Sequence, residues 1–257
     1  MTPVKAKAIA GAALIALAMC LAGGGLYAMH LLKQKRFDPE TLCPLEGSKT
    51  VTLIVIDKTD PLTAPEQARI RSLVSGEAAA VERGERITVT LLREKEGTGE
   101  TVLETVADLC NPGAEANPLF ENPKRVAARY RDAFQAPIEA ALASMKSAGS
   151  APSSPIAGAI DASIVAGPES PGLRFKLILV SDLMEHTTDA SAYAGTLSEA
   201  ALHKAMPPGT QARLAGAEVR VLLLPRPRHA KQQDAAVAIW RRFLHTVSGR
   251  EPEIVRP

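Results

Sequence analysis

The feature that most constrains this chain is the run Thr50–Asp57, TVTLIVID, which is apolar without alternation and rich in β-branched residues. Such a run is typical of a strand buried on both faces of a parallel sheet. A second run, Leu177–Val180, is followed directly by Ser181 and Asp182. Ligands of open α/β sheets bind outside the carboxyl ends of the strands. Asp57 and Asp182 therefore predict a polar site at one edge of an α/β sheet.

Strand and helix patterns alternate along residues 49–250. The expected strands are Thr50–Asp57, Arg86–Arg93, Thr101–Leu109, Leu173–Val180 and Glu218–Leu224, and the expected helices are Ala64–Arg83, Pro123–Met145, Ile156–Val165, Ser198–Met206 and Lys231–Val247. The polar turn Glu94–Glu100 returns the chain as a hairpin, so the third strand is expected to run antiparallel at an edge. The predicted fold is a doubly wound, mainly parallel sheet with one antiparallel edge strand and helices on both faces. Residues 37–48 are expected to be a tether and residues 251–257 a tail.

The amino terminus carries an apolar segment, Ala8–Met29, with basic residues on both sides. About 20 apolar residues match the thickness of the hydrocarbon core of a bilayer, and this segment is longer than the apolar core of most signal peptides. We therefore predict that residues 1–36 are a membrane anchor with one transmembrane helix. A signal peptide cleaved near Ala22-Gly23-Gly24 is the alternative.

Two of the three cysteines lie outside the apolar segment, which contains Cys20. Cys43 precedes the first strand and Cys110 ends the antiparallel strand, so both are expected at the amino-end edge of the sheet. A disulfide is then geometrically possible, and two buried free thiols are the alternative. A disulfide indicates an oxidising compartment. We therefore predict a single-pass inner-membrane protein with its domain in the periplasm.

Charge and aromatic content exclude one class of partner. The net charge is +2 with acidic and basic residues interspersed, and aromatic residues make up 4% of the chain. Neither a basic footprint nor a set of base-stacking aromatics is present, so nucleic-acid binding is not expected. The basic run Arg226–His229 is interpreted as a solvated loop, and His186 as a solvated loop histidine.

The residues at the carboxyl edge resemble the metal-binding loops of the von Willebrand factor A domain. Asp57 and Thr59 match the first two positions of its Asp-x-Ser-x-Ser motif, Ser153 or Ser154 matches the loop hydroxyl, and Asp182 matches the acid after the fourth strand. The resemblance covers about residues 45–250, and the antiparallel third strand agrees with it. It implies a Mg²⁺ site that a carboxylate of a protein partner completes.

Two positions depart from this pattern. Pro61 stands at the third hydroxyl position, and Leu183 stands where the family has glycine. Mg²⁺ prefers oxygen ligands and keeps several waters, so the remaining oxygens form either a degenerate metal site or none. In the second case Asp57 and Asp182 cap the helices that follow them.

A rival resemblance uses the same residues. Asp57–Thr63, DKTDPLT, is similar to the phosphorylation loop of P-type ATPases and haloacid dehalogenases, which implies an Mg²⁺-dependent phosphohydrolase with Asp57 as nucleophile. Asp60 and Pro61 replace the flexible glycine and the phosphate-binding threonine of that loop. We therefore favour a non-enzymatic, membrane-anchored protein-interaction module, an accessory or assembly factor of a bacterial envelope system. Its working surface is expected at Asp57–Thr63, Ser153–Ser154 and Asp182–Thr188.

Overall fold

The structure is a computed structural model that describes residues 3–33, 37–95, 98–119, 121–143, 150–169 and 172–256. The chain divides into two compact units, Met1–Phe37 and Asp38–Pro257. The first unit contains helix α1 (Pro3–Lys33), whose side chains at residues 13–28 are exposed. Among the described residues, no helix meets both the length and the apolarity that crossing a membrane requires. The segment Ala8–Met29 is thus helical, as predicted, but is not identified as a membrane span.

The second unit is built on a six-stranded sheet in the order β3-β2-β1-β4-β5-β6. The strands are β1 (Thr50–Lys58), β2 (Arg86–Glu94), β3 (Thr101–Cys110), β4 (Arg174–Ser181), β5 (Glu218–Leu223) and β6 (Glu253–Val255). Only β3 runs antiparallel to its neighbour, and every other pairing is parallel. The predicted fold class is confirmed, and β1 to β5 begin and end within one residue of the expected positions.

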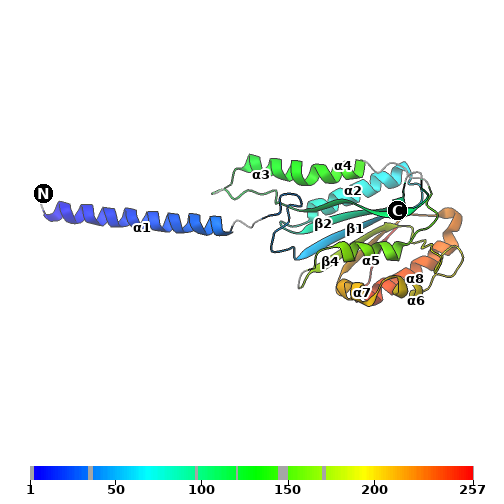
Figure 1. The fold of residues 1–257 in the computed structure, drawn as a ribbon. Helices are drawn as coiled ribbons and strands as arrows, with labels where there is room; N and C mark the ends of the chain where they lie inside the picture. Colours follow the sequence, from blue (N-terminus) through cyan, green and yellow to red (C-terminus); the bar gives the residue numbers. More distant parts are fainter. Residues whose placement is uncertain are drawn as a thin grey trace. The chain divides into compact units, whose positions relative to one another are not determined.

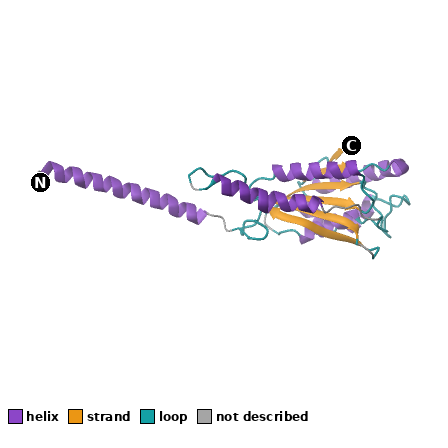
Figure 2. Ribbon diagram, turned by 90° about the horizontal axis from the view of Figure 1, so that it is seen from above, coloured by secondary structure: helices purple, strands orange, loops and turns teal. Residues whose placement is uncertain are grey.

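Helices cover both faces of this sheet (Figure 1). They are α2 (Ala64–Ala80), α3 (Pro123–Tyr130), the π-turn η1 (Arg131–Gln135), α4 (Ala136–Ala143), α5 (Ile156–Ala166), α6 (Glu199–Ala205), α7 (Pro208–Leu214), the 3₁₀ turn η2 (Pro227–His229) and α8 (Ala230–Ser248). Figure 2 shows the strands lying between the two helical layers. α2, η1 and α4 pack on one face, and α5 to α8 pack on the other.

Strand β1 lies at the centre because both of its faces are covered. Leu53 and Val55 pack with Ile160 and Trp240 on the α5–α8 face, whereas Ile56 packs on the opposite face. Every β1 residue after Thr50 is buried, which is why its sequence shows no polar alternation. This burial fixes the carboxyl end of β1, and with it the position of the predicted site.

Three local features differ from or refine the expected fold. Helix α7 and strand β6 are absent from the sequence-based assignment, and β6 recruits residues 253–255 of the expected tail into the sheet. The helix over Pro123–Ala143 continues through Pro137 by widening into the π-turn η1 just before it. Such a bulge accommodates a proline that lacks a backbone N–H.

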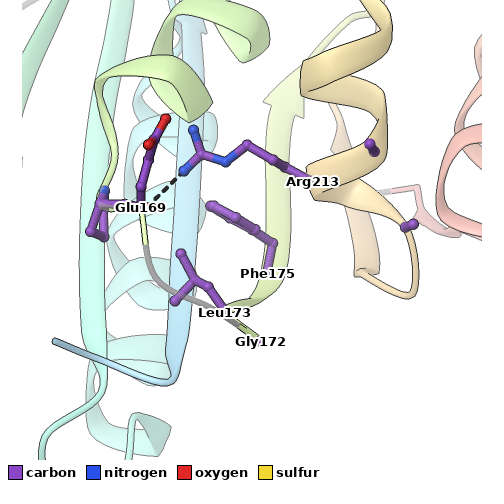
Figure 3. A pocket seen from close by; sticks show the side chains of 8 residues that line it. Glu169, Gly172, Leu173, Phe175 and Arg213 are labelled. Atoms are coloured by element: carbon purple, nitrogen blue, oxygen red, sulfur yellow. Dashed lines mark hydrogen bonds between the residues drawn. The ribbon is translucent and has the colours of Figure 1, made fainter.

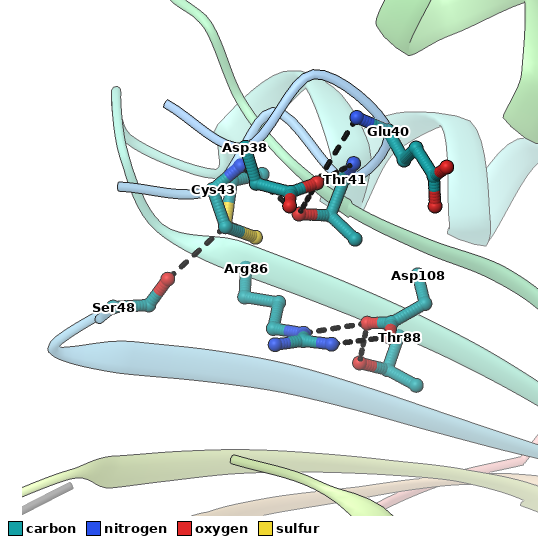
Figure 4. Close-up of a disulfide and its surroundings, with 9 residues drawn as sticks. Asp38, Glu40, Thr41, Cys43, Ser48, Arg86, Thr88 and Asp108 are labelled. Atoms are coloured by element: carbon teal, nitrogen blue, oxygen red, sulfur yellow. Dashed lines mark hydrogen bonds and ion pairs between the residues drawn. A yellow bond between two sulfur atoms is a disulfide. The ribbon is translucent and has the colours of Figure 1, made fainter. Parts of the chain in front are cut away.

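The predicted disulfide between Cys43 and Cys110 is present (Figure 4). Cys110 lies opposite Arg86 at the amino end of β2, which is the edge where both cysteines were expected. The Ser48 hydroxyl lies 3.0 Å from the Cys110 sulfur, and the Cys110 amide donates to the Thr41 carbonyl at 2.8 Å. The expected tether is therefore fastened to the sheet from Asp38 onward and belongs to the domain.

Candidate functional site

The carboxyl ends of β1 and β4 bring most of the predicted site residues together. The first carboxylate oxygen of Asp57, Oδ1, accepts hydrogen bonds from the Thr59 amide at 3.0 Å and the Thr59 hydroxyl at 2.6 Å. The second, Oδ2, accepts from the Ser181 hydroxyl at 2.8 Å and the Ser154 hydroxyl at 3.4 Å. Asp57 is 4% exposed. Its carboxylate is thus held by hydroxyl and amide donors from three segments, after β1, before α5 and at the end of β4.

The structure separates the two candidate loop serines. The Ser154 hydroxyl lies 3.0 Å from the Thr59 hydroxyl and points into the cluster. Its backbone pairs with His186 in a short antiparallel bridge, with N–O distances of 2.7 and 2.9 Å. Ser153 instead bonds the Thr101 hydroxyl at 2.9 Å on the side of β3. Ser154 is therefore the loop hydroxyl of the site, and Ser153 is not part of it.

Asp182 is the second buried carboxylate, at 4% exposure. Its Oδ1 accepts from the Met184 amide at 2.8 Å, and its Oδ2 lies 2.8 Å from the guanidinium Nε of Arg226. Burial, and after it the charge of Asp57, raises the pKa of Asp182 to about 7, whereas Arg226 opposes the shift. Asp182 therefore depends on Arg226 as its charge partner.

Arg226 was not recognised from the sequence, and its interpretation as part of a solvated loop is wrong. Its side chain is 17% exposed, and besides Asp182 it lies 3.4 Å from Asp60 and 3.4 Å from Glu66. The signal that could have found it is its place: Arg226 follows β5, the next parallel strand, at the same edge as Asp57 and Asp182. A basic residue three positions beyond a buried strand reaches Asp182 at this edge.

Leu183 has a backbone φ of 61°, in the left-handed region that favours glycine. It stands where the resembling family has glycine, so the turn after β4 keeps a glycine-like conformation with a leucine in it. Leu183 is fully buried and its amide donates to the Ser181 hydroxyl at 2.9 Å. A left-handed leucine costs about 1–2 kcal/mol, and packing in the core offsets this strain.

The helix-cap interpretation of the two carboxylates is also wrong. Helix α2 is capped by Thr63, in a reciprocal capping box with Glu66, and not by Asp57. After Asp182 no helix begins before Glu199 within the described segment 172–256. Both carboxylates therefore serve the cluster at the sheet edge.

The residues present do not fit the Mg²⁺ ion that the resemblance implies. In the described parts of the chain, no group of three or more His, Cys, Asp or Glu side chains is arranged to hold a metal. Both oxygens of Asp57 accept hydrogen bonds, Oδ1 of Asp182 accepts one and Oδ2 of Asp182 is in the ion pair with Arg226, and Pro61 is exposed and offers no side-chain oxygen. A guanidinium supplies the positive charge instead. We therefore assign no role to Mg²⁺.

An exposed aromatic side chain lies beside this cluster. Tyr193, 39% exposed, has its ring 5.5 Å from the His186 ring and 5.1 Å from the His229 ring, both edge to face. His186 is half-buried, and its Nδ1 lies 3.0 Å from the Ser191 hydroxyl. This contact holds the imidazole ring in place. Burial, followed by the charge of Asp182, raises the pKa of Tyr193 to about 12. Its hydroxyl therefore keeps its proton at physiological pH.

Glu185 is a buried carboxylate that no motif in the sequence singles out. It is 2% exposed, and its Oε2 accepts from the Ala157 amide at 3.0 Å in the first turn of α5. Burial raises the pKa of Glu185 to about 7. It anchors the loop after β4 to helix α5, and so connects two of the segments that form the site.

A separate pocket of about 420 Å³ lies near the amino end of β4 (Figure 3). The Arg213 guanidinium lies over the Phe175 ring, 5.3 Å from its centroid, and donates to the Pro168 carbonyl at 2.8 Å. These contacts hold α7 against β4. None of the predicted site residues lines this pocket.

Comparisons with known proteins give only distant similarity. No family model and no curated protein matches the chain. One similar solved structure is BatB from Bacteroides thetaiotaomicron, a conserved hypothetical protein, at 14% identity over 71% of this chain and 69% of that chain, with a TM-score of 0.35. Another is an aerotolerance-related membrane protein from Bacteroides fragilis, at 12% identity over 77% of this chain and 99% of that chain, with a TM-score of 0.36. A von Willebrand factor type A structure from Catenulispora acidiphila is similar at 14% identity over 79% of this chain and 42% of that chain, with a TM-score of 0.35. Because all three TM-scores are below 0.5, the fold class rests here on strand order and register.

Proposed function

We propose that the domain from Asp38 onward is a protein-binding module that acts outside the cytoplasm through the carboxyl edge of its sheet. Tyr193, an exposed tyrosine held in one orientation beside an internally satisfied polar cluster, is the observation that carries this proposal. We propose an accessory or assembly role in a bacterial envelope system, with a protein as the partner.

Tyr193 is suited to bind a partner because its side chain loses little conformational entropy on binding. Tyrosine is enriched among the residues that dominate binding energy at interfaces. Two edge-to-face contacts with His186 and His229 already restrict its ring, so little rotamer entropy remains to be lost on binding. The neighbouring loop hydroxyls and carboxylates are hydrogen-bonded to each other, so a partner can cover this edge without leaving them unpaired.

The compartment is inferred from the disulfide. Cys43 and Cys110 are paired, and such bonds persist in oxidising compartments. We further propose that residues 1–36 attach the chain to the inner membrane and that the domain lies in the periplasm.

Carbonate extraction of membranes tests this anchor. The full chain should stay in the membrane pellet at alkaline pH, and a chain that begins at Asp38 behind a cleavable signal should be released to the soluble fraction. Release of the full chain under the same conditions would contradict the proposed anchor.

No observation favours the alternative of a phosphohydrolase. Asp57 would have to attack a phosphoryl group, but it is 4% exposed and both its oxygens accept hydrogen bonds from the protein. Asp60 and Pro61 occupy the positions of the flexible glycine and the phosphate-binding threonine of that loop.

Photo-crosslinking from position 193 tests the proposed surface. A photoreactive phenylalanine analogue at Tyr193 should give a discrete adduct in the native membrane, and the same analogue at Leu119, which is 80% exposed, serves as the control. With the partner identified by mass spectrometry, Tyr193→Ala should weaken binding by about 10- to 30-fold, as for an interface hot spot, and Tyr193→Phe by much less. Equal crosslinking from both positions, or unchanged binding of Tyr193→Ala, would place the function elsewhere.

A further inference from the structure

We infer that Arg226 is a resident cation of the carboxyl-edge site: its guanidinium is the charge partner of Asp182, the predicted metal ligand that it contacts, and of Asp60 and Glu66, so these three acids need no metal to neutralise them. This inference does not depend on the proposed protein binding. It rests on three features of the structure, namely the carboxylates that Arg226 joins, the way its backbone is held and the permanence of its charge.

The guanidinium lies among carboxylates from three different segments. Its Nε is 2.8 Å from Asp182, after β4, and 3.4 Å from Asp60, in the loop after β1. Its Nη1 is 3.4 Å from Glu66, in the first turn of α2. Three acidic groups thus converge on one positive charge.

Arg226 is held in this position from behind by Gln233, a buried residue of α8. The Gln233 side-chain oxygen accepts from the Arg226 amide at 3.0 Å, and its nitrogen donates to the Asp182 carbonyl at 2.9 Å and the Leu224 carbonyl at 2.8 Å. One amide side chain therefore fixes the backbone of both members of the closest ion pair. The cation is a built part of the site and not a surface side chain in a chance contact.

The chemistry of the two kinds of cation differs in a way that matters for the site. A guanidinium keeps its charge at every physiological pH and matches planar carboxylates with several N–H donors. It needs no supply of metal from the surroundings. Removing it leaves Asp60, Glu66 and Asp182 facing one another with no charge partner in this group, and a divalent cation becomes the favourable replacement.

Manganese binding to the full-length protein tests the inference, with Mn²⁺ itself as the probe and the spectrum of the free ion as the readout. The unmodified protein should show no saturable Mn²⁺ binding below about 1 mM. Arg226→Gln should lower the melting temperature by about 10 °C, the scale expected for breaking a buried ion pair in a domain of this size. It should also gain one saturable Mn²⁺ site, and Mn²⁺ should raise its melting temperature by several degrees.

Two further variants keep the test sharp. Arg228→Gln removes an exposed arginine from the same segment and should match the unmodified protein in melting temperature and in Mn²⁺ binding. Arg226→Lys keeps a cation, so its melting temperature should lie between those of Arg226→Gln and the unmodified protein. It should not gain a Mn²⁺ site. If Arg226→Gln fails to fold, refolding with millimolar Mn²⁺ should restore it.

Several results would overturn the inference. One is saturable Mn²⁺ binding by the unmodified protein that Asp182→Asn abolishes, because the metal would then be the resident cation. Another is a lower melting temperature of Arg226→Gln without a new Mn²⁺ site, because Arg226 would then only bridge the loops. Failure of Mn²⁺ to rescue an unfolded Arg226→Gln, or identical melting of Arg226→Gln and Arg228→Gln, would count equally against it.

Discussion

Removal of the Cys43–Cys110 disulfide should lower the free energy of unfolding by about 4 kcal/mol. The two cysteines are 67 positions apart in the sequence, and a cross-link over such a loop restricts the unfolded chain by about this amount in the chain-entropy account. The same bridge fastens residues 38–48 to the amino-end edge of the sheet. The double variant Cys43→Ser/Cys110→Ser should therefore melt about 10 °C below the unmodified protein, measured by circular dichroism.

The control is Cys20→Ser, which removes the free cysteine of helix α1 and leaves the disulfide intact. It should not change the melting temperature of the domain. A double variant that melts within 2 °C of the unmodified protein would show that the bridge contributes little to folding, and would weaken the inference that the domain requires an oxidising compartment.

The bounds of the strands could be predicted closely because buried strands have continuous apolar sequences. β1 is buried on both faces and carries an unbroken apolar run, and its neighbours share that pattern. Helix α7 and strand β6 were missed because each is short, seven and three residues, so neither repeats its pattern often enough to be recognised. Tertiary pairing with β5, not local preference, makes residues 253–255 a strand.

The candidate site was predictable only where strands end in it. Asp57 lies near the carboxyl end of one buried strand and Asp182 directly follows another, so sheet topology alone places them at one edge. Ser153 and Ser154 are adjacent and chemically alike, and only the bridge to His186 turns the second of them inward.

Arg226 and Tyr193 lie in irregular segments, and composition does not say which loop side chain folds back onto the sheet. The departure at Pro61 was visible in the sequence, but the guanidinium that supplies the positive charge of the site was not. For this reason the sequence pointed to a weakened metal site, whereas the structure shows a site whose acids are already paired.

Glu185 is expected to make the stability of the domain depend on pH between about 4.5 and 7. Burial raises the pKa of Glu185 from its ordinary value of 4.5 to about 7 in the folded protein. In this range the folded state binds more protons at Glu185 than the unfolded state does, so stability falls as the pH rises. The loss of folding stability caused by ionising Glu185 is absent below pH 4.5 and reaches about 3 kcal/mol above pH 7, because each unit of pKa shift corresponds to about 1.36 kcal/mol.

Glu185→Gln should remove this dependence while keeping an oxygen that accepts from the Ala157 amide. Denaturant unfolding at pH 4.5, 6 and 8 measures it as the difference between variant and unmodified protein, so that other titrating groups largely cancel. The variant should gain about 3 kcal/mol relative to the unmodified protein between pH 4.5 and 8. Glu115→Gln, at an exposed glutamate, should give no such change. A pH-independent difference for Glu185→Gln would mean that Glu185 stays ionised, with donors or water compensating its buried charge.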